Sequence, residues 1–239
     1  MNTDMIIGAT EDSMRTEWQA LATPLTSVPS IAYHSSRAAE KLLAVYESIE
    51  SKLPNNNSRI ISFIGTTPTD GTSALTRAYA NLLCNELEKR ILLLRARDTS
   101  THLNVPACKA CEDVVRGKGS LVDVVRQVAD SQLYLGYVST NGRSIATLAT
   151  RPAFLDVTRE LRYSFDYVVL DASACLSPAE AVSLCVRSDG TVVVVESERT
   201  RWQVAKHLCD DIESRGGNLL GVVLNKVQRH IPDNLYRWL

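Results

Sequence analysis

A loop framed by two glycines is the part of this sequence best suited to chemistry. Gly65 follows the apolar run Ile60–Ile64, Gly71 precedes a helical pattern that starts near Thr72, and Thr-Thr-Pro-Thr-Asp lies between the glycines. A strand, a glycine-framed loop and a helix in this order place backbone N–H groups and a helix N-terminus around a phosphate. The loop therefore indicates phosphate binding, and the simpler alternative is a strand-to-helix turn capped by small residues.

The charged groups that such a loop uses are altered here. An active phosphate-binding loop has a lysine that reaches the phosphates and a Ser or Thr hydroxyl that holds Mg²⁺. Ser73 can supply the hydroxyl, but Thr72 stands at the lysine position and the glycine spacing is one residue longer than usual. Asp70 adds a negative charge where phosphates would sit. From the loop alone, both interpretations stay open.

Charged residues also follow two other apolar runs. Asp171 closes the run Tyr167–Asp171, where an acid would position Mg²⁺ or a water molecule, or would simply cap a strand. Arg95 and Arg97 follow Ile91–Leu94, where they could supply the charge lost with the lysine, or be paired and solvated. Asp171 is therefore the one candidate for a catalytic residue.

The composition is that of a folded protein without a nucleic-acid or membrane-spanning signature. The chain has 239 residues, of which 45% are hydrophobic and 22% charged, and its net charge is −1. This balance excludes a disordered chain, and the lack of a basic excess predicts no nucleic-acid partner. The apolar runs are far shorter than the roughly 20 residues that span a bilayer, and the N-terminus does not form a secretory signal.

The cysteines predict a reducing compartment. The six cysteines are scattered, so we expect reduced thiols in a cytoplasmic protein. Cys108 and Cys111 form a CxxC pair, but no second pair or histidine cluster accompanies it, which favours a structural role over a redox or zinc site. No metal site is expected.

Apolar periodicity predicts one α/β domain. Short β-branched runs alternate with helical patterns over residues 30–239, after a flexible N-terminal arm at 1–29. The strands are apolar on both faces, so we expect a mainly parallel sheet with helices on both sides. Strands are predicted at 60–64, 91–94, 133–138, 167–171, 191–195 and 219–224, and helices at 31–53, 72–89, 111–116, 121–128, 151–163, 178–186 and 201–214.

Cations surround a tryptophan where the predicted helix at 201–214 begins. This cluster is either a solvated face with the Trp202 indole packed on the sheet, or a docking patch for a partner; its cations are Arg199, Arg201 and Lys206. The tail from Ile231 to Leu239 carries further apolar and aromatic residues. It could contact a membrane surface or a partner protein, or pack back on the domain.

The order of several segments is more specific than any one of them. They are PTDGTS at 68–73, RAR at 95–97, CEDVVRG at 111–117, FDYVVLD at 165–171, DGTVVVV at 189–195 and GVVLNKVQRHIPDNLYRWL at 221–239. Over about residues 31–239 this series resembles the cytoplasmic kinase domain of bacterial tyrosine autokinases. Those domains form part of the capsular and exopolysaccharide co-polymerase family, within the MinD/ParA-like P-loop ATPases.

The resemblance implies a three-layer P-loop fold with a nucleotide site. The family core Pro-Gly-Glu-Gly-Lys-Ser corresponds to 68–73, so Thr72 replaces its lysine, and Arg95 and Arg97 replace two of its three magnesium-linked acids. Asp171 is the acid that remains. The family also phosphorylates a C-terminal tyrosine cluster, of which Tyr236 alone is present. The candidate nucleotide-binding residues are Gly65, Thr67, Asp70, Gly71, Thr72, Ser73 and Asn225.

These departures predict a catalytically impaired, kinase-like accessory protein for bacterial exopolysaccharide synthesis or export. It would act as a regulator or scaffold, in the cytoplasm and held at the inner membrane by a polysaccharide co-polymerase or export protein. No cofactor is expected, although Gly65, Gly71 and Ser73 would still admit ATP and Mg²⁺. A homo-oligomer is the other partner considered, but the family's Glu/Arg oligomerisation motif is unmatched, because Leu43 and Tyr46 follow Glu40.

Two alternative functions remain open from the sequence. The first is an active ATPase or tyrosine autokinase in which Arg95, Arg97 or a partner's arginine replaces the lysine, with Asp171 and Ser73 on Mg²⁺. The second is a MinD/ParA-like positioning ATPase. The missing lysine argues against both, because phosphoryl transfer depends on positive charge around the phosphates.

Overall fold

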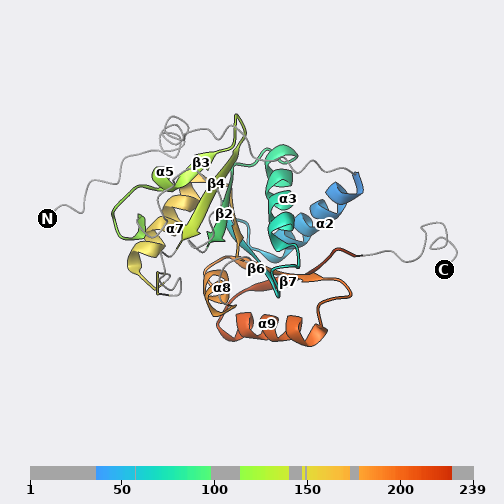
Figure 1. Ribbon diagram of the computed structural model, residues 1–239. Helices are drawn as coiled ribbons and strands as arrows, with labels where there is room; N and C mark the ends of the chain where they lie inside the picture. The colour runs from blue at the N-terminus through green and yellow to red at the C-terminus, as the bar shows by residue number, and fades with distance from the viewer. Residues whose placement is uncertain are drawn as a thin grey trace.

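Within the described residues, seven strands form one sheet in the order β3-β4-β2-β5-β1-β6-β7 (Figure 1). The computed structural model describes residues 36–56, 58–97, 114–139, 147–148, 150–172 and 178–227. Every neighbouring pair of strands is parallel except β3 with β4. The expectation of a mainly parallel α/β sheet is confirmed.

The bounds of the elements follow the apolar pattern. Each predicted strand is present, with bounds equal to or slightly longer than expected. The strands are β1 Arg59–Gly65, β2 Ile91–Arg97, β3 Val125–Gln127, β4 Leu133–Ser139, β5 Tyr167–Asp171, β6 Gly190–Glu196 and β7 Leu219–Asn225. The helices are α2 Ser36–Lys52, α3 Thr72–Asn85, α5 Leu121–Val124, α7 Pro152–Ser164, α8 Pro178–Cys185 and α9 Trp202–Ser214. The expected arm at 1–29 and the first half of the helix expected at 111–116 lie outside the described residues.

The sheet separates two layers of helices (Figure 1). On one face, α2 and α3 pack on a core that includes Phe63, Tyr79 and Val169. On the other face, α7, α8 and α9 cover the second and third core clusters, which contain Val168 and Val193. The central strands are buried on both faces, which explains their continuous apolar sequences. No helix among the described residues combines the length and apolar character needed to cross a membrane.

The predicted helix at 121–128 is wrong in its second half. Ser120 and Asp123 form a capping box that starts α5, but α5 ends at Val124 and the chain continues as β3. The apolar spacing suits a helix, yet Val125 pairs instead with Gly136 of β4. Gly136 also leaves room for the Leu94 side chain of β2, because a Cβ atom at position 136 would meet a Leu94 methyl group at 2.7 Å. Tertiary pairing therefore overrides the local helical spacing.

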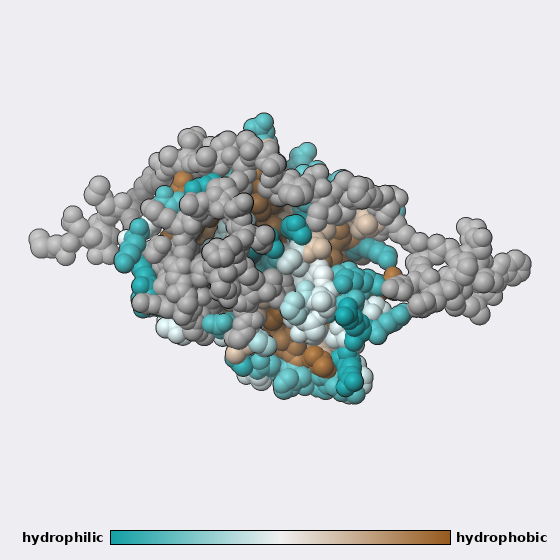
Figure 2. All heavy atoms as spheres, viewed as in Figure 1, coloured by the Kyte–Doolittle hydropathy of each residue, from teal (hydrophilic) through white to brown (hydrophobic). Residues whose placement is uncertain are grey.

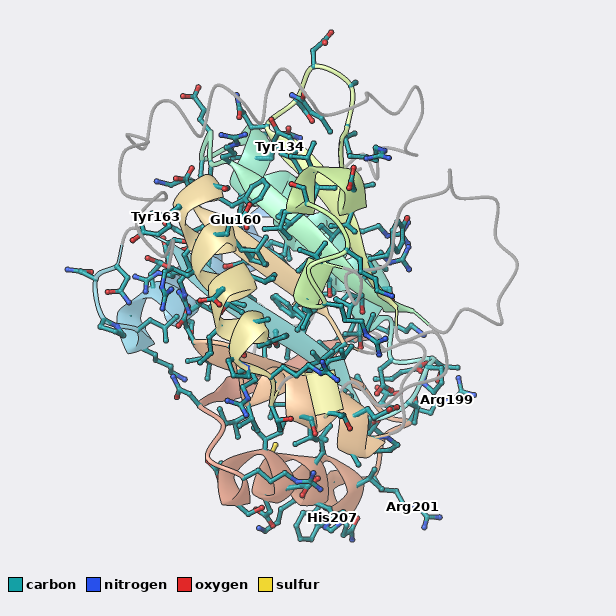
Figure 3. The ribbon with its side chains drawn as sticks, turned by 90° about the vertical axis from the view of Figure 1, so that its left-hand side faces the viewer. Tyr134, Glu160, Tyr163, Arg199, Arg201 and His207 are labelled. Carbon is teal, nitrogen blue, oxygen red and sulfur yellow. The ribbon has the colours of Figure 1, made fainter. Side chains whose placement is uncertain are left out.

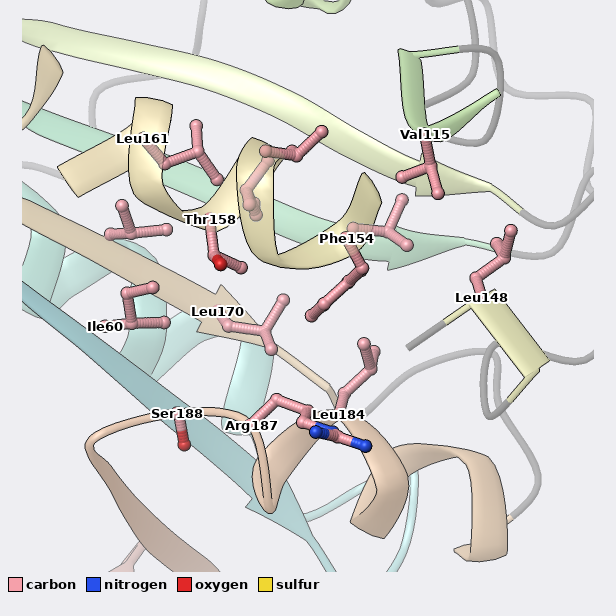
Figure 4. Close-up of a pocket in the computed structure, with 14 residues that line it drawn as sticks. Ile60, Val115, Leu148, Phe154, Thr158, Leu161, Leu170, Leu184, Arg187 and Ser188 are labelled. Carbon is pink, nitrogen blue, oxygen red and sulfur yellow. The ribbon is translucent and has the colours of Figure 1, made fainter. Parts of the chain in front are cut away.

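A small apolar cavity of about 60 Å³ remains under α7 (Figure 4). Phe154 of α7, Leu170 of β5 and Leu184 of α8 are among the residues that line it. Nearly all of the lining is aliphatic or aromatic, so a water molecule would lack the polar partners that it needs. We regard the cavity as a packing gap in the core.

The described cysteines behave as core or near-core thiols. Cys84, Cys185 and Cys209 are free, and Cys185 is buried under α9. Burial raises the pKa of the Cys185 thiol to about 12, which keeps it protonated and unreactive at neutral pH. Cys108, Cys111 and Cys175 lie outside the described residues.

Candidate phosphate-binding loop and its charges

The glycine-framed loop lies beyond the carboxyl end of β1, where the strand order changes direction. From β1, α3 leads to β2 on one side of the sheet, whereas β6 and β7 lie on the other side of β1. In open α/β sheets, ligands bind in the crevice at such a switch point. Residues 66–71 therefore occupy the place where a ligand is expected.

Both framing glycines are required by the packing of the loop. Gly71 caps α3 with φ at 79°, a left-handed conformation that glycine adopts without strain. A Cβ atom there would meet Asn225 Nδ2 at 2.5 Å, and this amide donates a hydrogen bond to Asp70 O at 2.8 Å. A Cβ atom on Gly65 would meet Thr72 Oγ1 at 2.5 Å. The loop is thus closed tightly against α3 and the end of β7.

The Asp70 carboxylate fills the loop to which it belongs. Its Oδ2 atom accepts hydrogen bonds from the backbone amides of Thr66 at 2.7 Å and Thr67 at 2.8 Å. The Thr66 hydroxyl also donates to Oδ2 at 2.6 Å, and the Thr67 hydroxyl donates to Oδ1 at 2.8 Å. Thr200, in the turn after β6, donates to Oδ1 at 3.2 Å. The loop therefore surrounds an anion supplied by its own chain.

This carboxylate is ionised although it is buried. Asp70 is 1% exposed, and its burial raises the pKa of the carboxyl group. The hydrogen bonds from Thr66 and Thr67 outweigh that effect, so the pKa of Asp70 lies below its usual value. A phosphate approaching the same amides would meet a fixed negative charge.

Thr72, at the expected lysine position, contributes no charge. It is 2% exposed, and its hydroxyl has no hydrogen-bond partner in the part of the chain that the structure describes. A lysine does reach the loop from another element, because Lys226 Nζ donates to Thr69 O at 2.5 Å. The same ammonium lies 3.4 Å from Glu196 Oε1. Lys226 is therefore held on the outside of the loop by groups of the protein itself.

Asp171 is paired with an arginine. It ends β5, with Phe63 of β1 as its register partner on one side and Arg95 of β2 on the other. Arg95 Nε lies 3.5 Å from Asp171 Oδ2, and the Asp171 side chain is 2% exposed. The carboxylate that could have held a metal ion is thus neutralised by a cation of the same chain. Of the two interpretations of Arg95, the structure agrees with the one in which the arginine is paired. The Arg97 side chain lies outside the described part of the structure.

The structure brings the candidate residues together and adds three more. Thr66 within the loop, and Thr200 and Lys226 from other segments, make hydrogen bonds in the loop without having been predicted. Thr200 gave no signal, because it meets Asp70 across 130 positions of sequence. Tyr236 lies outside the described residues. The predicted residues that surround the start of α3 are Gly65, Thr67, Asp70, Gly71, Thr72, Ser73 and Asn225, with Asp171 at the end of the strand beside β1.

Replacing Asp70 with asparagine is expected to lower the free energy of unfolding at pH 7 by about 1–3 kcal/mol, because the amide leaves donors of the loop unpaired. The folded-state pKa of Asp70 is depressed, so its stabilising contribution is present above the unfolded pKa of about 3.9 and is lost as the pH falls through the folded pKa. Urea unfolding should therefore show a constant difference between the two proteins from pH 7 to about pH 5, and a shrinking one below about pH 4. The exposed Asp156→Asn variant is the control, and a difference that grows on acidification would contradict this account.

Comparison with known proteins finds a similarity to a bacterial polysaccharide biosynthesis transport protein. No protein-family model matches it. It is 26% identical over 225 residues to the succinoglycan biosynthesis transport protein ExoP of Rhizobium meliloti, an alignment that covers 91% of this chain and 28% of ExoP. The chain therefore spans less than a third of the length of that relative.

Solved structures agree with the fold. The kinase domain of the Escherichia coli tyrosine kinase ETK matches with a TM-score of 0.73 and 17% identity, covering 87% of this chain and 84% of that one. The resemblance to bacterial tyrosine-kinase domains is confirmed. The septum site-determining protein MinD of Pyrococcus horikoshii, solved with Mg-ADP, matches with a TM-score of 0.51 and 17% identity over 75% of this chain and 76% of that one. The three-layer P-loop fold is therefore shared with kinase-like and MinD-like proteins.

The residues of this loop do not fit a magnesium nucleotide as they stand. The amides of Thr66 and Thr67 are occupied by Asp70, and Thr72 offers a hydroxyl where a phosphate would need an ammonium group. A phosphate would have to displace a buried and strongly hydrogen-bonded carboxylate. The arrangement is chemically suited to holding the loop closed.

Proposed function

We propose that this protein is a catalytically impaired, tyrosine-kinase-like accessory protein for bacterial exopolysaccharide biosynthesis or export. It acts as a regulator or scaffold on the cytoplasmic side of the inner membrane, bound to a polysaccharide co-polymerase or export protein. The observation that carries the proposal is the Asp70 carboxylate, which accepts the hydrogen bonds of the Thr66 and Thr67 amides in the place of a phosphate.

The charges around the loop support impaired catalysis. In phosphoryl transfer the protein mainly positions the reactants and stabilises negative charge, and it does so chiefly through a lysine and through acids that bind the metal ion. Thr72 and Arg95 stand where the related kinases have a lysine and an acid, and Asp171 is paired with Arg95. Loss of one positively charged group from such a site lowers the rate by about 10³–10⁵-fold. Combined changes of this kind leave no efficient route to phosphoryl transfer.

The closed loop also supports a scaffold role. Asp70 connects the loop after β1 to the turn after β6 through Thr200, and Asn225 at the end of β7 donates to the Asp70 carbonyl. These contacts hold the ends of three strands together without a bound ligand. A surface of constant shape is what a structural partner needs. The relation to ExoP, a succinoglycan biosynthesis transport protein, supports the polysaccharide process.

Complementation of a deletion strain tests the proposal. The variant Thr72→Ala/Asp171→Asn removes the hydroxyl at the lysine position and the one remaining magnesium-linked acid, and we expect it to restore polymer output to the wild-type level. Thermal unfolding of the purified variant confirms that it is folded. If the folded variant fails to restore polymer while wild type succeeds, the protein acts through its loop chemistry and the scaffold proposal is wrong.

A further inference from the structure

Exposed apolar side chains lie on β7, just after its end and at the start of α9. Val222 is 48%, Leu224 64% and Val227 52% exposed, and Trp202 at the start of α9 is 67% exposed. We call these four residues the β7 edge surface. At 67% exposure the indole of Trp202 is not packed on the sheet, which corrects that part of the solvated-face interpretation. Figure 2 shows hydrophobic side chains at the surface alongside α9, next to hydrophilic ones.

The α9 side of β7 is left uncovered over the second half of the strand, at Val222 and Leu224. The register partners of Val222 and Leu224 are Val193 and Val195 of β6, which lie in the core cluster beneath α8 and α9. Val193 and Val195 are 0% and 4% exposed, whereas their neighbours on β7 are about half exposed or more. α9 therefore covers β6 and the start of β7, where Leu219 packs against the same cluster, and leaves this face open at Val222 and Leu224.

The backbone edge of β7 is also open. Asn225 O accepts a hydrogen bond from Ser197 N, so Asn225 turns its carbonyl towards the β6 side. Alternate residues of a parallel strand direct their backbone groups to opposite sides, so Val222 and Leu224 direct theirs away from β6. No other described strand pairs with that edge. Such an edge is a template for an added strand.

Cations stand at both ends of the open edge. Lys52 Nζ donates to Leu220 O at one end, and Lys226 follows the other end. Arg199 and Arg201 lie at the outer end of α9, as Figure 3 shows. The carboxylates there are Glu196, which is 13% exposed and lies 3.6 Å from Arg199 and 3.4 Å from Lys226, and the exposed Glu198. The rim of the edge therefore carries excess positive charge.

These charges disfavour a second copy of the chain as the occupant. If two β7 strands paired antiparallel with Val222 opposite Leu224, Lys226 of each copy would lie opposite Leu220 of the other copy. The carbonyl of Leu220 already holds Lys52. Like charges would then meet at both ends of the pairing, which is destabilising.

A lipid surface is disfavoured for a different reason. The outward amides and carbonyls of Val222 and Leu224 need hydrogen-bond partners, and the interior of a bilayer provides none. An extended peptide satisfies them and also covers the apolar side chains beside them. The lysines at the two ends of the edge indicate the charge of that peptide, because acidic residues at its ends would lie beside them.

We propose that the β7 edge surface binds an extended segment of a partner protein as an added strand. This segment carries apolar side chains at alternate positions over Leu224 and Trp202, and acidic residues at its two ends beside Lys52 and Lys226. The inference rests on the proposed scaffold role in one respect, which is that the partner is a protein. Its test uses neither nucleotide nor polymer, so it can fail while complementation succeeds.

Binding of labelled peptides to the full chain tests this site. The probes are a fluorescein-labelled peptide EEVTVTVEE and its charge-reversed counterpart KKVTVTVKK, which have the same apolar core. Fluorescence anisotropy should give the acidic peptide a dissociation constant at least about tenfold lower, because opposite charges stabilise the rim contacts and each 1.4 kcal/mol is tenfold. Hydrogen exchange at the amides of Val222 and Leu224 should slow when the acidic peptide is added.

A matched pair of variants separates strand addition from surface stickiness. Leu224→Pro removes an outward N–H without removing a bond to β6, and should weaken acidic-peptide binding at least about tenfold. Leu224→Thr keeps the N–H and should retain most of the binding. Circular dichroism checks that both variants are folded. If Leu224→Pro is unfolded, the hydrogen-exchange measurement on the wild-type protein still tests the proposal.

Four results overturn the proposal. They are no binding of the acidic peptide up to millimolar concentration, equal binding of the basic peptide, unchanged binding by folded Leu224→Pro, and no added protection at Val222 and Leu224. The surface would be assigned to a membrane if the acidic peptide did not bind and the protein sedimented with phosphatidylglycerol vesicles only when Trp202 was present. A concentration-dependent dimer lost in Leu224→Pro would assign it to a second copy.

Discussion

Replacing Asp70 with glycine and Thr72 with lysine together is expected to give the protein a measurable affinity for Mg-ATP, roughly 10–100-fold above that of wild type. The glycine releases the amides of Thr66 and Thr67 from the carboxylate that occupies them. The lysine restores an ammonium group for the phosphates. A charge-assisted hydrogen bond contributes about 1.5–3 kcal/mol, which corresponds to the affinity range given above. Isothermal titration with ATP, with and without Mg²⁺, measures the change.

The single variants provide the controls for this result. Thr72 Oγ1 and Asp70 Oδ2 lie 2.5 and 3.3 Å from the point where a Cβ atom of Gly65 would stand, so a lysine at position 72 starts close to the Asp70 carboxylate. Thr72→Lys alone should therefore pair internally and gain little affinity. Asp70→Gly alone frees the amides but adds no cation, and should gain less than the double variant. Equal ATP affinity in wild type and the double variant would show that Asp70 does not block the loop.

The largest stability effect is expected at Arg59, where methionine should lower the free energy of unfolding by about 2–4 kcal/mol. The guanidinium is 5% exposed and lies between α2 and the start of β1, 2.9 Å from Glu50 Oε1. It also donates to Pro54 O at 2.6 Å. Glu50 attracts this cation and raises the pKa of Arg59 against the opposing effect of burial. Without Arg59, Glu50 keeps its hydrogen bond from the Tyr167 hydroxyl but loses its countercharge.

An exposed arginine provides the matched control for Arg59. Arg159 and Asp156 on α7 form an ion pair whose side chains are 65% and 72% exposed. Arg159→Met should change the free energy of unfolding by less than about 1 kcal/mol, because solvent screens such pairs. Urea unfolding at pH 7 compares the variants. Similar losses at Arg59 and Arg159 would contradict the claim that the buried pair anchors α2 to the sheet.

Much of the fold follows from local sequence patterns. The strands Ile91–Arg97 and Gly190–Glu196 contain continuous apolar runs, which are typical of strands buried on both faces of a sheet and of few other structures. The sequence of β3 is different, because Val125–Gln127 has the spacing of a helix and becomes a strand only through its pairing with β4. Pairing with the next strand is not encoded in the spacing of apolar residues within β3, so this part could not be predicted.

The candidate site divides in the same way. The loop residues and the missing lysine are visible in the sequence, since they lie between a strand and a helix. The role of the Asp70 carboxylate depends on where its side chain points and on Thr200 from a distant turn. Likewise, Arg95 and Asp171 are recognisable as charged strand ends, but only the register of β2 and β5 places them opposite each other. Trp202 was ambiguous because a sequence does not reveal which flank of a helix another element covers.

Isothermal titration of the wild-type protein with ATP and ADP, with and without Mg²⁺, tests the central claim most directly. The account predicts no binding at millimolar nucleotide, because the Asp70 carboxylate already occupies the amides of the loop. Tight, Mg²⁺-dependent binding of ATP to the wild-type protein would contradict it. That result would mean that the loop opens for nucleotide despite Asp70, and that the protein is not a scaffold with a closed site.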